Sequence, residues 1–277
     1  MTSPLIASHR PLFGQSMLDK PTDLALMEKF AQPAAIERWL EEMVQSGVTT
    51  LTVPLDERIL SILRRRRDLA IEIIPITPNV NGLVREATEY GMMGAGFRLV
   101  RRLGFGTMIR LGIHALPKAH LVLRKHFPTM LSVLFDLELS LFRTFKPRRV
   151  LLHPQICDLI LAMGNSAFFE QYAGMLRSRV GVEPGVCSNN FGTLANSFHR
   201  WGTPLSLVMT PVNEEGWLMK PTPEAVRAQL NNSEWTILAD RPILSPPPTH
   251  EHIEQALRWN AVTQVVVDVE NWKEFKI

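Results

Sequence analysis

The chain has 277 residues, of which 45% are hydrophobic and 21% are charged. This composition is typical of a globular protein and excludes a collagen-like or largely disordered chain. Its two cysteines are too few for a disulfide framework, and no apolar run reaches the roughly 18 residues that a membrane-spanning helix needs. The first residues lack the basic and apolar regions of a signal peptide. We therefore expect a cytoplasmic protein, and peripheral attachment to a membrane stays open.

The positive charge is concentrated in one stretch, from Tyr90 to Phe135. This stretch contains no Asp or Glu, and its seven basic residues exceed the net charge of +3 for the whole chain. They are Arg98, Arg101, Arg102, Arg110, Lys118, Arg124 and Lys125. Their neighbours are mainly aliphatic, whereas proteins that bind single-stranded nucleic acid present aromatic stacking platforms. We expect no nucleic-acid partner.

Short β-rich runs alternate with helical patterns along the chain, which favours βα units around a parallel sheet. The predicted strands are 11–15, 48–53, 71–76, 148–153, 182–187, 205–209, 235–239 and 263–267. The predicted helices are 33–45, 57–67, 129–144, 166–178, 193–201, 223–230 and 250–259. Eight strands with seven intervening helices predict the α/β class and a (β/α)₈ TIM barrel. An open doubly wound sheet is the alternative, but no GxGxxG motif follows the first strand.

The barrel is expected to be one domain over residues 1–277, with a long insertion at 77–128 after the third strand. A βα connection of about fifty residues far exceeds the usual 2–6 residues, and it leaves the barrel on the face where barrel enzymes place their sites. This basic insertion has three functional readings: a lid that binds an anionic substrate, an element that docks on an anionic membrane, or one that docks on an acidic protein partner. Helices with a solvated basic face are the structural alternative.

Several motifs in chain order resemble those of the aldo-keto reductase family. They are Gly47-Val48-Thr49-Thr50-Leu51, Glu138-Leu139-Ser140-Leu141-Phe142-Arg143, Val150-Leu151-Leu152-His153-Pro154, Gly185-Val186-Cys187-Ser188-Asn189-Asn190-Phe191, Pro211-Val212-Asn213 and Asp240-Arg241-Pro242-Ile243. The resemblance covers nearly the whole chain outside 77–128. It implies a TIM barrel and an oxidoreductase that reduces carbonyl groups with NADPH.

The resemblance also implies a catalytic tetrad, most of which this sequence lacks. Family members use a Tyr proton donor supported by Lys, Asp and His, and His153 matches the family histidine. The second strand ends in Val53-Pro54-Leu55-Asp56-Glu57 rather than D-T-A, and no Tyr precedes Tyr90. The third strand, Ile71–Ile76, offers no Lys. Ordinary carbonyl reduction would therefore lack its acid, and a pseudoenzyme is one expectation.

On the cofactor side, Ser188 and Asn189 match the family pair that holds the nicotinamide amide. The family glutamine of the sixth strand corresponds to Met209, and the aromatic residue that stacks on nicotinamide corresponds to Asp240. At the eighth strand, Asp268-Val269-Glu270 replaces the glycine and basic residues that bind phosphate. These carboxylates would repel the 2′-phosphate of the cofactor. NADP or NAD remains a candidate cofactor on the strength of Ser188 and Asn189.

Independently of the resemblance, residues at the strand ends form a candidate catalytic set on the carboxyl-terminal face of the barrel: His153, Asp56, Asp240 and Arg241. Arg241 next to Asp240 would keep the carboxylate ionised and leave donors for a substrate anion. Helix caps and a buried histidine are the structural alternative. We expect no metal site, because His114, His120 and His126 are spaced i, i+6 and share no helix face.

Three functions stay open. The first is a divergent reductase-like barrel that either acts on NAD(P)(H) or binds a small-molecule ligand at the carboxyl-terminal face. The second is a non-catalytic interaction protein that docks on a membrane or larger assembly through residues 90–135. The third is a cofactor-independent lyase or isomerase that uses Asp56, His153, Asp240 and Arg241.

Overall fold

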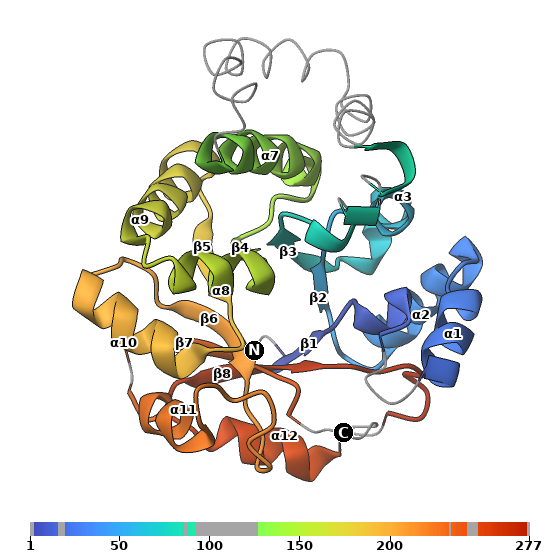
Figure 1. The fold of residues 1–277 in the computed structure, drawn as a ribbon. Helices are drawn as coiled ribbons and strands as arrows, with labels where there is room; N and C mark the ends of the chain where they lie inside the picture. Colours follow the sequence, from blue (N-terminus) through green and yellow to red (C-terminus); the bar gives the residue numbers. More distant parts are fainter. Residues whose placement is uncertain are drawn as a thin grey trace.

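The computed structural model describes residues 3–15, 20–82, 84–85, 88–91, 127–232, 234–242 and 249–275. Eight parallel strands close into a barrel in chain order, each paired with its neighbour in sequence and β1 with β8. They are β1 (Leu5–Ala7), β2 (Thr50–Val53), β3 (Glu72–Thr77), β4 (Arg149–Leu152), β5 (Glu183–Cys187), β6 (Leu207–Pro211), β7 (Thr236–Asp240) and β8 (Val262–Val267). The predicted (β/α)₈ barrel is confirmed, and helices surround it (Figure 1).

The helices in the described part of the chain agree with most of the predicted ones. They are α1 (Lys20–Lys29), α2 (Pro33–Gln45), α3 (Glu57–Arg65), α7 (Phe127–Phe142), α8 (Pro154–Ala162), α9 (Ser166–Met175), α10 (Phe191–Trp201), α11 (Pro223–Leu230) and α12 (His250–Leu257). Sequence patterning missed α1 and α8. Helix α1 buries only Leu26 and leaves Leu24 and Met27 exposed, so it lacks the periodic apolar face that predicts a helix.

The first strand lies earlier in the chain than the sequence predicts. Residues 11–15 were predicted as a strand, but β1 is Leu5–Ala7, and Arg10–Phe13 form a 3₁₀ helix. Pro11 lies in the first turn of that helix, where its missing N–H is not needed. The correction matters because it places His9 and Arg10 directly after β1, at the carboxyl-terminal mouth of the barrel.

The strands are buried on both faces, which explains their continuous apolar sequences. One buried cluster fills the barrel interior, and its members are Ile6, Ile74, Ile76, Leu151, Cys187, Leu207, Met209, Leu238 and Val266. A larger cluster packs the outer faces of the strands against the helices. Inside the barrel, a Cβ added at Gly185 would lie 2.6 Å from a Leu151 methyl group and 2.8 Å from Leu207, so this position needs glycine for close packing.

Local signals fix several helix starts. Asp56 caps α3, because its carboxylate accepts hydrogen bonds from the backbone N–H groups of Arg58 and Ile59. The Thr222 hydroxyl accepts from the backbone of Ala225 at the start of α11.

The connection between β3 and α7 includes residues 92–126, which lie outside the described residues, as does most of the predicted docking element 90–135. Among the described helices, none is long and apolar enough to cross a membrane.

Candidate functional site at the barrel mouth

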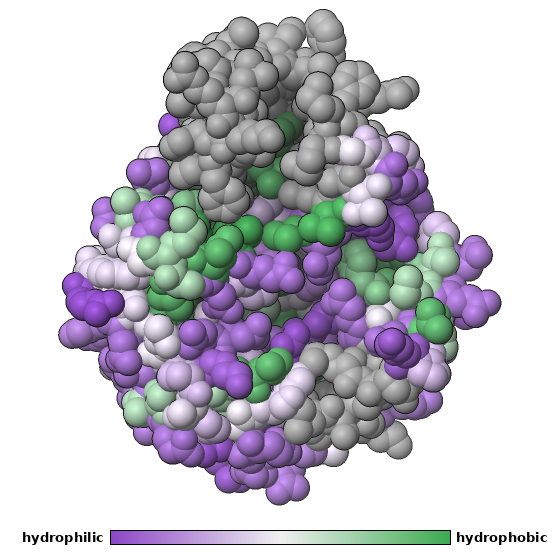
Figure 2. All heavy atoms as spheres, in the orientation of Figure 1, coloured by the Kyte–Doolittle hydropathy of each residue, from purple (hydrophilic) through white to green (hydrophobic). Residues whose placement is uncertain are grey.

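A cavity of about 340 Å³ opens at the carboxyl-terminal ends of the strands. In Figure 2, hydrophilic side chains gather around a hollow in the middle of this barrel face. The polar residues of its lining include His9, Arg10, Asn79, His153, Gln155, Ser188, Asn189, Asp240 and Arg241. These residues end or follow five of the strands, β1, β3, β4, β5 and β7, as expected where parallel strands deliver their carboxyl-terminal ends to one face.

Arg10 is the centre of a buried ion-pair network in this cavity. Its Nη1 donates to Asp240 Oδ2 at 2.8 Å and its Nη2 to Asp240 Oδ1 at 2.5 Å, a bidentate pair. Its Nε donates to both carboxylate oxygens of Asp268 at 2.9 and 3.1 Å. Burial alone would raise the pKa of Asp240, but the Arg10 guanidinium outweighs burial and holds that pKa below its usual value. One cation therefore links the ends of β1, β7 and β8.

Arg241 is the second guanidinium in the cavity wall, and it is only loosely paired. Its Nε lies 3.8 Å from Asp240 Oδ2, beyond hydrogen-bond distance, and this buried nitrogen has no hydrogen-bond partner among the described residues. The guanidinium lies over the Trp217 ring at 5.7 Å, and the backbone of Arg241 has a positive φ of 50°. The side-chain amide of Asn213 donates to the carbonyl oxygens of Trp217 and Arg241 and so fixes the two residues together. A strained backbone and an unpartnered buried donor are typical of functional sites.

Two histidines in the cavity are neutral near pH 7. Burial and the neighbouring Arg10 cation lower the pKa of His9 to about 3, and burial lowers the pKa of His153 to about 4. His9 Nδ1 lies 3.1 Å from Thr52 Oγ1 at the end of β2. His153 Nδ1 accepts from the backbone N–H of Gln155 at 3.3 Å, so the proton of the neutral ring belongs on Nε2. His153 can therefore donate a hydrogen bond from Nε2 but does not supply a positive charge.

The pair Ser188–Asn189 is held by Asp158 on α8. The Ser188 hydroxyl donates to Asp158 Oδ1 at 2.6 Å, and the Asn189 backbone N–H donates to Oδ2 at 3.3 Å. The same hydroxyl accepts from the backbone N–H of Asn190 at 2.9 Å. Burial raises the pKa of Asp158 against these hydrogen bonds. The hydroxyl of Ser188 is therefore engaged within the protein, whereas the Asn189 side chain borders the cavity.

Behind the cavity, Glu138 on α7 supports the end of β3. Its carboxyl group accepts from the Thr77 hydroxyl at 2.8 Å and from the backbone N–H of Asn79 at 2.9 Å. The Asn79 side chain in turn donates to the Leu55 carbonyl at 2.7 Å and borders the cavity. Glu138 is 1% exposed, and burial raises its pKa to about 7.

The structure gathers five of the six residues singled out from the sequence. His153, Ser188, Asn189, Asp240 and Arg241 line the cavity. Asp56 is the exception: its carboxylate caps α3 and pairs with Arg58, and it is not among the lining residues. Arg241 lies within ion-pair distance of adjacent Asp240, as expected, but the hydrogen bonds to both Asp240 oxygens come from Arg10.

Sequence reasoning missed His9, Arg10 and Asp158. The predicted strand at 11–15 hid the first two, because it placed them before a strand rather than after one. The missed helix α8 hid Asp158. The sequence did contain a signal: the short apolar run Leu5–Ala7 is followed by the polar residues Ser8-His9-Arg10. This pattern is typical of a buried strand whose carboxyl end contributes polar residues to a site.

The residues present do not fit a dinucleotide held in the manner that the resemblance implies. Asp240, in the place of the stacking aromatic, is bound on both oxygens by Arg10. Asp268, in the place of the phosphate-binding residues, is bound by the same guanidinium. A nicotinamide ring and a cofactor phosphate placed as the resemblance implies would compete with Asp240 and Asp268 for the Arg10 guanidinium.

Comparisons with known proteins bear on the fold. No protein-family model and no curated protein matches the chain. A solved structure of a Pseudomonas aeruginosa protein, provisionally assigned as an aldo-keto reductase, superposes with a TM-score of 0.57 at 14% identity, over 98% of this chain and 86% of that one. The holo form of an aldo-keto reductase from Bacillus halodurans is more distant, with a TM-score of 0.45 at 10% identity over 88% and 80% of the two chains. The expected resemblance thus holds for the architecture, and this chain folds as the aldo-keto reductases do.

Proposed function

We propose that this reductase-like barrel binds a small organic anion at its mouth, by contacts that do not involve a dinucleotide. The observation that carries the proposal is Arg241, a largely buried guanidinium whose Nε has no hydrogen-bond partner in the described part of the chain. Its nearest carboxylate, Asp240, already accepts two hydrogen bonds from Arg10. Arg241 therefore has donors left for a ligand carboxylate or phosphate group.

The rest of the lining supports an anionic ligand. Asp240 is the single acidic residue among the described residues that line the cavity, and Arg10 neutralises it. His153 contributes an Nε2–H donor, and Gln155 and Asn189 add side-chain amides. A volume of about 340 Å³ lies near the lower end of the range for small-ligand sites. The ligand is therefore a small acid, bound by convergent donors.

Acid–base chemistry on such a ligand would fall to His153. With a pKa of about 4, its neutral ring can hydrogen-bond to a ligand oxygen through Nε2 and stabilise negative charge that develops there. Asp240 is unsuited to act as a base, because the guanidinium of Arg10 keeps its pKa low and occupies both oxygens. Within this proposal, a cofactor-independent lyase or isomerase would use Arg241 for binding and His153 for polarisation.

Reduction that depends on NAD(P)(H) is the second candidate, and the position of Asn189 at the cavity edge favours it. We rank it below anion binding, because Arg10 ties together Asp240 and Asp268 where the cofactor would lie.

The test is a thermal-shift and calorimetric screen of small mono- and dicarboxylates and inorganic phosphate, with Arg241→Gln beside the wild type. Arg200→Gln is the matched control, since Arg200 also lies over a tryptophan, at 6.0 Å from the Trp201 ring, but is outside the cavity. At a ligand concentration 100 times Kd, binding should stabilise the wild type and Arg200→Gln by about 2.7 kcal/mol and should be weakened at least tenfold in Arg241→Gln.

Equal binding to all three proteins, or no binding of any anion, would refute the proposal. Tryptophan fluorescence titrations with NADPH and NADH form the second arm of the screen. Saturable binding of either dinucleotide in the micromolar range would instead establish the reductase candidate and require the Arg10 network to open.

A further inference from the structure

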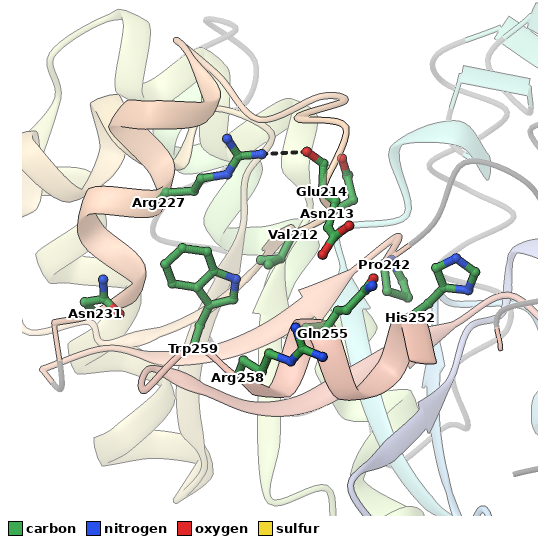
Figure 3. A pocket seen from close by; sticks show the side chains of 11 residues that line it. Val212, Asn213, Glu214, Arg227, Asn231, Pro242, His252, Gln255, Arg258 and Trp259 are labelled. Atoms are coloured by element: carbon green, nitrogen blue, oxygen red, sulfur yellow. Dashed lines mark hydrogen bonds between the residues drawn. The ribbon is translucent and has the colours of Figure 1, made fainter. Parts of the chain in front are cut away.

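A second and larger cavity, of about 560 Å³, lies outside the barrel strands, between α11 and α12 (Figure 3). Its walls come from both helices and from the segments after β6 and β7. None of the residues that line it belongs to the lining of the mouth cavity. The groove is therefore a separate place for a ligand, and its volume lies within the range for small-molecule sites.

Two guanidinium groups reach into this groove. Figure 3 shows Arg227, from α11, and Arg258, from the end of α12, on either side of the Trp259 indole. Arg227 donates one hydrogen bond, 2.6 Å long, to the Glu214 carbonyl oxygen, which leaves its other N–H groups available. Within the described part of the chain, neither guanidinium has a carboxylate within ion-pair distance. Glu214 is the single acidic residue in the lining, so the described walls carry a net charge of +1 (two Arg minus one Glu).

The remaining lining combines one aromatic and several apolar residues with the polar side chains of Asn213, Asn231, His252 and Gln255. Trp259 is half-buried, and its indole makes no ring–ring contact with any described residue. Val212, Ala256 and Pro242 are buried and form apolar parts of the lining. Gln255 adds an amide that can donate or accept. A flat aromatic surface beside two guanidinium groups that have no described carboxylate within ion-pair distance is suited to a ligand that is itself flat and negatively charged.

We infer that the groove between α11 and α12 binds a small aromatic anion, in which a planar ring packs on Trp259 and a carboxylate or phosphate group is held by Arg227 and Arg258. The two guanidinium groups offer fork-shaped pairs of donors that match either anionic group. The indole offers area for the ring at little entropic cost, because the side chain has two χ angles and is already half-buried. This inference does not depend on the function proposed for the mouth.

The experiment uses four defined probes with the full-length protein: phenyl phosphate and benzoate, which have both features, inorganic phosphate, which lacks the ring, and cyclohexanecarboxylate, which lacks aromaticity. Because carboxylates and phosphate can also bind at the mouth, calorimetry measures Kd for each probe on the Arg241→Gln protein, in which the mouth site is weakened, and the groove variants are made in that protein. We expect phenyl phosphate or benzoate to bind at least tenfold more tightly than both incomplete probes. Arg258→Gln and Trp259→Leu should each weaken that binding at least tenfold.

Arg200→Gln is the matched control for Arg258→Gln, because Arg200-Trp201 repeats the Arg-Trp sequence at the end of α10, outside the groove. Arg227→Gln provides a second variant on the other wall, should Trp259→Leu fold poorly. In the wild type, any binding of the probes at the mouth should disappear on Arg241→Gln, whereas binding in the groove should remain. The inference is overturned if no aromatic anion binds, if Arg241→Gln abolishes the binding while Arg258→Gln and Arg227→Gln retain it, or if inorganic phosphate binds as tightly as phenyl phosphate.

Discussion

Glu138 offers a direct test of the structure behind the mouth, because it is a buried carboxyl group for which the described residues provide no cationic partner. Burial raises its pKa from 4.5 to about 7. Each pKa unit corresponds to 1.36 kcal/mol, so this shift in pKa corresponds to a pH-dependent contribution of about 3 kcal/mol to the free energy of unfolding. The folded state binds the proton more tightly than the unfolded state. The stability that this group contributes is therefore fully present below pH 4.5 and is lost as the pH rises through about 7.

The perturbation is Glu138→Gln, which removes the titration but keeps an oxygen that can accept from the Asn79 N–H. Urea unfolding of both proteins is measured from pH 4 to 8 at fixed ionic strength. Relative to Glu138→Gln, the wild type should lose about 3 kcal/mol of unfolding free energy between about pH 4.5 and 7 and then level off.

His9 and His153 change stability in the opposite direction. Their lowered pKa values stabilise the folded state above pH 6.5, and this contribution is lost as the pH falls toward 4 and 3. The wild type and Glu138→Gln both contain His9 and His153, so the contribution of the histidines cancels in the difference between the two unfolding free energies. A difference that stays constant with pH would refute the assignment of Glu138 as a buried, titrating group.

Three further changes test the network, a helix cap and the barrel packing. Arg10→Met should lower the unfolding free energy by about 3–5 kcal/mol, because it leaves buried carboxylates unpaired. Adding Asp240→Asn should recover part of this loss. A loss below about 1 kcal/mol in Arg10→Met would show that the network is dispensable for stability. Asp56→Ala should cost about 1 kcal/mol in urea unfolding, and Asp56→Asn much less, whereas loss of ligand binding in Asp56→Asn would contradict its role as a cap. Gly185→Ala should destabilise by about 1–3 kcal/mol, since its Cβ would lie 2.6 Å from a leucine methyl group. Gly174→Ala, in a helix with nothing within 4 Å of the new Cβ, should stabilise by about 0.5–1 kcal/mol and is the control.

The fold could be predicted because its signals are local and repeat along the chain. Strands such as Arg149–Leu152 and Thr236–Asp240 are largely apolar runs that alternate with helices, and the same rhythm recurs along the chain from the second strand on. The first strand failed because three residues, Leu5–Ala7, are too few to produce a pattern. Its place is set by pairing with β8, which is a contact across the whole length of the chain that no local window detects.

The site could be predicted only as far as strand ends identify it. Polar residues at the ends of predicted strands were taken as site candidates. This identified His153, Ser188 and Asp240, because each directly follows or ends a strand that was placed correctly. It could not find the partner of Asp240, because Arg10 is 230 residues away in sequence and the two meet only when β1 closes the barrel between β8 and β2. The adjacent Arg241 was the partner that the sequence suggested, and its Nε does lie 3.8 Å from Asp240 Oδ2, but Arg10 donates the hydrogen bonds to both Asp240 oxygens. The closure of the barrel therefore decides the charges at the mouth: Arg10 takes Asp240, and Arg241 keeps donors that a ligand can use.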